Sequence, residues 1–163
     1  GVCGKATLGA LAVRGLKRIE EGGFCMTSDV LRSLPGKLLG LQRTFVRTGG
    51  LHATALVDSS GEIIDVAEDV GRHNAMDKLL GRSFLAGEWP LFNHLILVSG
   101  RASFELVQKA LLAGVPMLAA VGAPSSLAVE LADNFGITLA GFLSERRFNL
   151  YCRPERVEED ASS

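Results

Sequence analysis

The chain has 163 residues, of which 47% are hydrophobic, and its formal net charge is -1. This length suits a single domain with one core. A chain so close to neutral lacks the basic excess of nonspecific nucleic-acid binders, and no apolar run approaches the roughly 18 residues of a membrane span. The start of the sequence does not resemble a secretion signal. We therefore expect a cytoplasmic protein without nucleic-acid or membrane partners.

In chain order, the first part of the sequence favours two helices. An apolar stripe predicts a helix over residues 5–21. A second helix is expected from the cap at residues 27–29 to about Leu34. Pro35-Gly36 is expected to interrupt it before a further turn towards Gln42.

The next part favours a β-hairpin followed by a helix. Strands are expected over residues 52–57 and 62–67, on either side of the turn at residues 58–61. A helix is expected from Arg72 to about Leu80, with Gly81 as its stop.

The second half alternates strands and helices. Strands are expected at residues 94–98, 115–121, 137–142 and 148–151, with helices over 103–112 and 124–134. Near-continuous apolar strands that alternate with helices are typical of parallel sheets covered on both faces. The sequence therefore predicts one α/β domain over residues 1–153, with a mainly parallel sheet. Residues 154–163, acidic and ending in serine, are expected to form a frayed tail.

The loops that lead from strands into helices are the first candidates for a site, because ligands of such sheets bind there. Ser99-Gly100-Arg101-Ala102-Ser103 supplies a glycine, hydroxyls, a guanidinium and a helix start, which together suit a phosphate. Gly122–Ser126, with Ser125 at the next helix start, has similar chemistry without the guanidinium. Ordinary helix capping explains each serine alone equally well. Two successive loops of this kind favour a shared anion site.

The stretch Asp69-Val70-Gly71-Arg72-His73-Asn74 is denser in polar groups. It places an acid, a cation, an imidazole and an amide around one glycine at a helix start. Such density is costly to bury, so it favours a binding site that includes Gly71, Arg72, His73 and Asn74. His73 would act as a general base or a hydrogen-bond donor, although a lone histidine is more often structural. His52, beside Gly49-Gly50, is more often a core histidine.

A catalytic metal is not expected. Zinc deaminases need His-x-Glu and Pro-Cys-x-x-Cys, but the sequence has threonine where the glutamate would follow His52, and no Pro-Cys-x-x-Cys. It has no Walker loop and no nucleophile elbow. Its three cysteines have no framework spacing, so reduced thiols are expected. Among them Cys3, which glycines flank, is the one expected to be accessible.

Six segments in order resemble the formate dehydrogenase accessory sulfurtransferase (FdhD) family. They are Gly1-Val2-Cys3-Gly4-Lys5, Thr48–Ala53, Glu68–Lys78, Ser99–Glu105, Ala123–Ala128 and Gly141-Phe142. Each is weak alone, but together they span nearly the whole chain. The resemblance implies a three-layer α/β/α architecture with a mixed, mainly parallel, cytidine-deaminase-like sheet. This would explain why His52-Ala53 echoes a deaminase motif.

The resemblance also implies an activity. Such a protein accepts persulfide sulfur from a cysteine desulfurase. It passes the sulfur to the bis(molybdopterin guanine dinucleotide) molybdenum cofactor, before insertion into formate dehydrogenase. A homodimer is implied as well. The family's motif resembles Cys-Gly-x-Cys-Gly with the persulfide on the first cysteine. The chain begins after that position, so Cys3 corresponds to the second cysteine and the family's N-terminal segment is also missing.

The resemblance places the guanine-dinucleotide-binding stretch at Phe142-Leu143-Ser144-Glu145-Arg146-Arg147. The remaining expected cofactor-binding residues are His52, Gly71, Arg72, His73, Asn74, Ser99, Arg101, Ser103 and Ser125. Two other functions stay open from the sequence. One is a binding chaperone that delivers the cofactor with structural cysteines. The other is a deaminase-like nucleotide hydrolase, which would require zinc.

Overall fold

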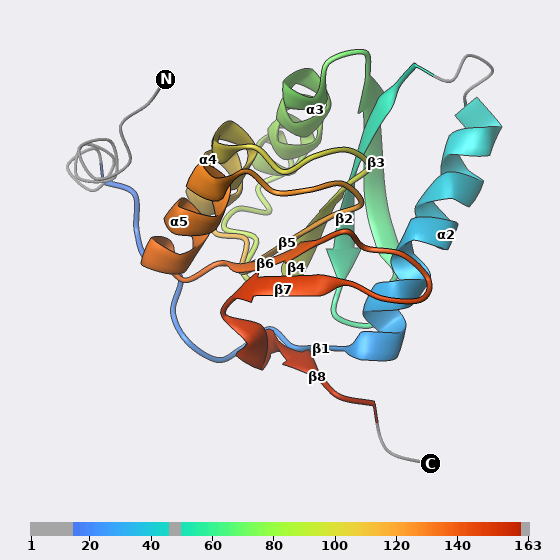
Figure 1. The fold of residues 1–163 in the computed structure, drawn as a ribbon. Helices are drawn as coiled ribbons and strands as arrows, with labels where there is room; N and C mark the ends of the chain where they lie inside the picture. Colours follow the sequence, from blue (N-terminus) through green and yellow to red (C-terminus); the bar gives the residue numbers. More distant parts are fainter. Residues whose placement is uncertain (1–14, 46–49, 161–163) are drawn as a thin grey trace.

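The protein consists of a six-stranded mixed sheet between two helical layers (Figure 1). A computed structural model describes residues 15–45 and 50–160. The strands are β2 (His52–Asp58), β3 (Ile63–Asp69), β4 (His94–Val98), β5 (Met117–Ala120), β6 (Thr138–Gly141) and β7 (Asn149–Cys152). Their order across the sheet is β3-β2-β4-β5-β6-β7.

The directions of the strands define two edges of the sheet. Strands β4, β5 and β6 pair in parallel, whereas β2 is antiparallel to β3 and β4, and β7 is antiparallel to β6. Four of the six strands, β3 to β6, therefore run the same way, which confirms the predicted mixed, mainly parallel sheet. We call the edge where these four strands end the carboxyl edge, and the opposite one the amino edge.

The helices cover both faces, as the three-layer prediction requires. Helices α3 (Arg72–Leu85), α4 (Phe104–Leu112) and α5 (Ser126–Phe135) lie on one face, and α2 (Ser28–Phe45) lies on the other (Figure 1). Neighbouring residues of one strand enter different cores: Ile96 packs with α3, α4 and α5, and Leu97 packs with α2. Because both faces are buried, the strands had to be apolar throughout, which is why the sequence revealed them.

Helix α2 runs through Pro35, so the predicted interruption at Pro35-Gly36 is wrong. A proline inside a helix costs about 3 kcal/mol because one hydrogen bond is lost. Leu31, Leu34 and Leu38 are each at most 1% exposed and pack in the core beneath the helix. Burying each leucine side chain contributes roughly 1.5–3 kcal/mol. The combined contribution exceeds the cost of the proline.

Helix α3 passes through the predicted stop at Gly81 and ends at Leu85. A glycine inside a helix costs only about 1 kcal/mol. The buried face of the helix continues beyond it, from Leu79 and Leu80 to Ser83. Packing therefore extends the helix by one more turn than local propensity predicts.

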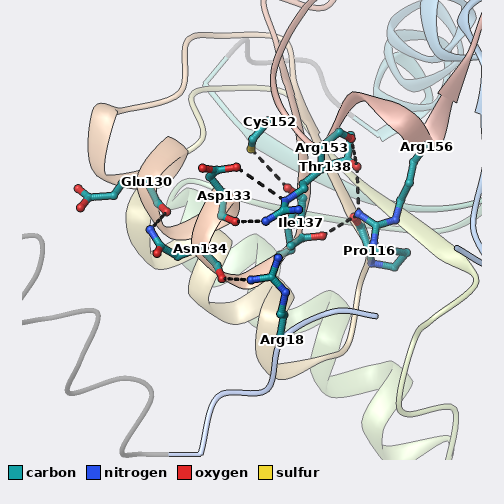
Figure 2. Close-up of polar contacts among 11 residues, drawn as sticks. Arg18, Pro116, Glu130, Asp133, Asn134, Ile137, Thr138, Cys152, Arg153 and Arg156 are labelled. Carbon is teal, nitrogen blue, oxygen red and sulfur yellow. Dashed lines mark hydrogen bonds and ion pairs between the residues drawn. The ribbon is translucent and has the colours of Figure 1, made fainter. Parts of the chain in front are cut away.

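Residues 16–20 form no helix, so the part of the predicted helix over 5–21 that the structure describes is wrong; residues 5–14 lie outside the described residues. Residues 15–20 instead form a strap along the end of α5. The Ile19 amide donates to Phe135 O at 2.8 Å, and the Arg18 guanidinium donates to Asn134 O at 2.7 Å (Figure 2). Gly136 permits this approach, because a Cβ there would lie 2.9 Å from Ile19 O.

Residues 154–160, predicted as part of a frayed tail, instead pack on the domain. The 3-10 helix η1 (Pro154–Arg156) leads into β8 (Val157–Glu158), which pairs in parallel with β1 (Met26–Thr27). The Asp160 carboxylate accepts a hydrogen bond from the Asp29 amide at 2.7 Å and so caps the start of α2. Acidic composition did not predict these contacts because their partners lie about 130 residues away.

Arg156 joins this C-terminal segment to the amino edge and is only 4% exposed. Its guanidinium donates to Thr138 Oγ1 at 3.1 Å and to the carbonyl oxygen of Pro116 at 3.3 Å (Figure 2). It also donates to the carbonyl oxygens of Gly136 at 2.7 Å and Glu20 at 2.9 Å. One side chain therefore holds the strap, β6 and the loop before β5 together.

Candidate functional site

Five predicted stretches lie together at the carboxyl edge. The loops after β4, β5 and β6 leave the sheet there, and so does the turn from β3 into α3. Because β2 runs antiparallel to its neighbours, its first residue, His52, lies at this same edge. The topology thus unites residues that are up to 95 positions apart in the sequence, from His52 to Arg147.

The loops after β4, β5 and β6 hold one another through their backbones. The Gly122 amide donates to Gly100 O at 2.9 Å, and the Phe142 amide donates to Gly122 O at 3.1 Å. Gly122 sits in the middle and has no room for a side chain, since a Cβ would lie 3.0 Å from Gly100 O. The three loops therefore form one backbone surface.

Helices α4 and α5 begin at this surface with serine caps. Ser103 Oγ accepts a hydrogen bond from the Leu106 amide at 3.4 Å, and Ser125 Oγ accepts one from the Ala128 amide at 3.1 Å. Helix capping, the alternative weighed for both loops, therefore describes these two hydroxyls. The attraction for an anion comes from the helix starts themselves, where unpaired amides and the positive end of the helix dipole lie.

Asp69 organises the start of α3. Its carboxylate accepts hydrogen bonds from the Gly71 amide at 2.8 Å, Asn74 Nδ2 at 3.2 Å and Lys78 Nζ at 2.8 Å. Gly71 is the N-cap of the helix and has no side chain to cap it, so Asp69 supplies the acceptor. Asn74 and Gly71, predicted to contact a ligand, are therefore engaged in building the turn.

This network predicts a pH dependence of stability. The hydrogen bond from Lys78, followed by that from the Gly71 amide, lowers the pKa of Asp69 to about 2. A carboxyl group whose pKa is lower folded than unfolded stabilises the fold above its unfolded value of about 3.9. This contribution is lost as the pH falls towards 2. Asp69→Asn should therefore flatten the loss of stability between pH 4 and pH 2 in urea unfolding.

The matched control is Glu88→Gln, at an exposed acid in the loop after α3, away from this edge. It should keep the slope of the wild type. Equal slopes for wild type and Asp69→Asn would contradict the role assigned to Asp69.

Two histidines flank the loop after β4. His73 Nε2 lies 3.4 Å from Ser103 Oγ and 3.9 Å from a carboxylate oxygen of Glu105. The ring of His52 lies against Gly100, where a Cβ would stand 3.2 Å from His52 Nδ1. Both predicted histidines thus border the same surface, and His73 is placed to share a proton with Ser103.

Positive charge at the edge comes from Arg72 and Arg101. The Nε of Arg72 is buried and has no hydrogen-bond partner within the described part of the chain. Arg101 is exposed in the loop after β4. Guanidinium groups bind phosphates in a bidentate manner. Ser99 has a structural role, since its hydroxyl accepts a hydrogen bond from the Ala53 amide at 2.9 Å and ties β2 to β4.

The stretch after β6 has one exposed and one buried side chain at its start. Phe142 has a φ of 51° and is 51% exposed. A bulky residue held in the left-handed region is strained, and such strain gathers at functional sites. Leu143 is only 1% exposed and packs in the core against α2. Because its side chain is buried, Leu143 can contact a ligand only through its backbone.

Residues 144–147 form a compact turn. Ser144 Oγ accepts hydrogen bonds from the amides of Arg146 and Arg147, each at 3.2 Å. Both arginines are exposed. Glu145 lies against α2, where a Cβ on Gly36 would stand 2.9 Å from its carboxylate. The turn thus presents two guanidinium groups beside Phe142.

Glu68 is a polar residue of this region that is not among the predicted site residues. Both of its carboxylate oxygens are buried and have no hydrogen-bond partner among the described residues. A signal was present in the sequence, because Glu68 lies two positions after Val66 on β3 and therefore on the same face. Val66 packs against the core beneath α2. An acidic residue on the apolar face of a strand indicates a functional role rather than a packing role.

The remaining predictions and features concern parts of the protein other than the carboxyl edge. Cys3 lies outside the described residues. Within residues 15–45 and 50–160, no group of three or more metal-binding side chains is found. In that same part of the chain, no helix is long and apolar enough to cross a membrane. A groove of about 750 Å³ lies at the amino edge, between the strap and residues 90–93 and 111–116. Its lining includes none of the predicted site residues that the structure describes.

The sheet and its two helical layers form an α/β/α fold like that of the deaminases. The guanine deaminase of Nitrosomonas europaea aligns with a TM-score of 0.56 at 15% identity, over 77% of this chain and 83% of that one. At this identity the likeness shows the fold alone. The particular family follows from the sequence: the chain belongs to the FdhD/NarQ family, which it matches over residues 1–158.

Relatives of this family are substantially similar. The sulfur carrier protein FdhD of Streptomyces avermitilis is 52% identical over 158 residues, 96% of this chain and 56% of that protein. FdhD of Mycobacterium tuberculosis is 53% identical over 159 residues, 96% of this chain and 57% of that protein. The crystal structure of a formate dehydrogenase accessory protein from Desulfotalea psychrophila has a TM-score of 0.77 at 30% identity, over 87% of this chain and 60% of that one. The chain thus spans about half the length of the curated relatives it matches.

Proposed function

We propose that the protein is a sulfur carrier for maturation of the molybdenum cofactor. It accepts persulfide sulfur from a cysteine desulfurase and passes it to the bis(molybdopterin guanine dinucleotide) cofactor before insertion into formate dehydrogenase. The observation that carries this proposal is the convergence of three helix starts with Arg72 and Arg101 at the carboxyl edge. This arrangement suits the pyrophosphates of a dinucleotide.

The stretch after β6 fits the guanine end of such a ligand. Phe142 offers an exposed aromatic face on which a base can stack. Arg146 and Arg147 add positive charge beside it, and guanidinium planes also stack on bases. The phosphates would then lie over the loops after β4 and β5, next to Arg101. His73 and Arg72 hold the cofactor rather than perform the transfer.

Sulfur transfer requires a thiolate that attacks the outer sulfur of the donor persulfide. One S–S bond forms as another breaks, and the donor leaves as a thiolate, so no oxidant is needed. Cys3 lies twelve residues before Gly15, where the described strap begins. Twelve residues span at most ~42 Å when extended. The five-residue strand β4 covers only ~17 Å, so Cys3 can reach the carboxyl edge.

The other two cysteines do not suit this chemistry. Burial, with Glu158, raises the pKa of Cys25 above its ordinary value. Burial also raises the pKa of Cys152 to about 11, which keeps its thiol protonated at neutral pH. The alternative is a binding chaperone that shields the cofactor, with all its cysteines structural. A homodimer, as the family resemblance implies, is compatible with either function.

A guanine nucleotide should protect the domain against heat, as a fragment of the cofactor. Bound at about 100 times its Kd, GDP would add about 2.7 kcal/mol of stability. For a chain of this size, that is a rise in Tm of roughly 5–10 °C. ADP at the same concentration should give a much smaller rise. Thermal unfolding followed by fluorescence measures both.

Arg101→Ala tests the location of the phosphates, and Arg82→Ala, at an exposed arginine of α3 that pairs with Asp65, is its matched control. The first should lose most of the GDP shift, and the second should keep it. Equal shifts with GDP and ADP would contradict a guanine-dinucleotide ligand.

A further inference from the structure

The carboxylate of Glu68 stands out among the polar groups of the described chain. Both of its oxygens are buried without a partner, although the residue as a whole is partly exposed. A buried carboxylate without donors costs several kcal/mol, so native structures almost always provide partners. The residue is partly exposed and so borders the surface, and a ligand that reaches its oxygens requires the side chain to rotate outward.

The register of the sheet places Glu68 at one end of a row along the carboxyl edge. Glu68 pairs with Ala53, whose amide and carbonyl both bond to Ser99. The register continues one position past the paired ends of β4 and β5. There Ser99 stands opposite Val121, and Val121 stands opposite Phe142 on the next strand. The residues two positions earlier on these three strands all pack in the core beneath α2: Leu97, Ala119 and Ala140. By alternation, the row lies on the α2 face of the sheet.

The two ends of this row differ in chemistry. Phe142 at one end is an exposed aromatic ring, and Glu68 at the other end is an acceptor with two oxygens. Four strand spacings separate them, a distance of ~19 Å. A single heterocycle cannot contact both residues. A ligand that spans the row therefore needs a second group at the Glu68 end, and that group must carry hydrogen-bond donors.

Two neighbouring N–H donors are the complement of a carboxylate with two free oxygens. The 2-amino-4-oxopyrimidine ring has this arrangement, with a ring N–H next to an amino group. Guanine and pterin share it. Arginine would be the complement within a protein, but the described residues provide no donor to Glu68.

We propose that Glu68 binds the N–H and amino edge of a 2-amino-4-oxopyrimidine ring at the β3 end of the carboxyl edge. This inference rests on the proposed function, because it assumes a dinucleotide lying along the row. If guanine occupies the end beside Phe142, the ring at Glu68 is the pterin of the same ligand. The phosphates then lie between the two rings, over the loops after β4 and β5.

The test compares three probes on the wild-type protein and on Glu68→Gln by calorimetry. Pterin-6-carboxylate carries the ring, lumazine-6-carboxylate has an oxygen in place of the amino group, and GDP reports on the other end. Glu68→Gln should weaken pterin-6-carboxylate binding at least about tenfold and leave GDP binding unchanged, since a neutral amide loses the charge-assisted hydrogen bonds. Lumazine-6-carboxylate should bind both proteins weakly. GDP and pterin-6-carboxylate should bind together without competition.

Glu62→Gln, at an exposed acid at the other end of the β-hairpin, is the matched control and should bind all three probes as the wild type does. Weakening of GDP alone by Glu68→Gln would support the same ring chemistry with guanine as its source. If neither probe is weakened, or if lumazine-6-carboxylate binds as well as pterin-6-carboxylate, the proposal is overturned. A wild-type protein that binds pterin-6-carboxylate but not GDP would instead remove the guanine part of the proposed function.

Discussion

Replacing both motif cysteines with alanine in the full-length protein, Cys3 and the first cysteine of the family's motif, is expected to reduce activation of formate dehydrogenase at least about tenfold, because the attacking thiolate is removed. Binding of GDP should be unchanged, since the carboxyl edge is built from other residues. The measurement is formate dehydrogenase activity in cells that lack their own carrier and receive the variant. The GDP-dependent rise in Tm serves as the check on folding and binding.

Cys25→Ala is the matched control for this prediction. Its thiol lies at the start of β1, and burial raises its pKa, so it contributes little thiolate at neutral pH. This variant should activate the dehydrogenase as the wild type does. Full activation after both motif cysteines become alanine would contradict the carrier function and favour the binding chaperone. Loss of both activation and GDP binding would show that the substitution acts on the fold instead.

The second large effect concerns stability. Arg156→Leu is expected to lower the free energy of unfolding by about 3–5 kcal/mol, because it leaves several buried acceptors without a donor. These are the carbonyl oxygens of Gly136 and Glu20 and the hydroxyl of Thr138, whereas the Pro116 carbonyl keeps the hydrogen bond from the Thr138 amide. Urea unfolding measures the loss. The strap should also loosen, since the hydrogen bond to Glu20 joins it to the C-terminal segment.

Arg153→Leu is the control, at an arginine of the same segment whose side chain is 25% exposed. It donates to Asp133 O at 2.8 Å and pairs with the Asp133 carboxylate (Figure 2), so its loss should cost about 1 kcal/mol. Similar losses for the two variants would contradict the role of Arg156 as a buried link.

Much of the fold could be predicted because its signals are local. Strands β4, β5 and β6 are apolar on both faces, and such runs are visible in the sequence without knowledge of their neighbours. Ser103 and Ser125 mark the starts of α4 and α5, since a cap acts within one turn. The loops between these elements were therefore assigned correctly. The carboxyl ends of parallel strands lie at one edge, so the expectation of a parallel sheet also predicted that these loops meet there.

The errors have a common cause, which is that packing outweighs local preference. Pro35 and Gly81 both disfavour a helix, yet buried faces carry α2 and α3 past them. The spacing of Leu16 and Ile19 imitates a helix, but the segment is a strap held by the end of α5. In each case the deciding partner lies far away in the sequence.

For the site, the sequence by itself determined which residues are candidates for the chemistry: the polar stretch after Gly71, the serine-rich helix starts, the arginines and Cys3. Only the tertiary structure decided what several of them do. It assigned Asn74 to the Asp69 turn, Leu143 to the core and the serine hydroxyls to capping. It also left both carboxylate oxygens of Glu68 buried, with no partner in the part of the chain that the structure describes. Glu68 stands at one end of a row that two antiparallel and two parallel strand pairings create. Residue types set the available hydrogen bonds, but which bonds form depends on strand register, and register is a property of the whole sheet.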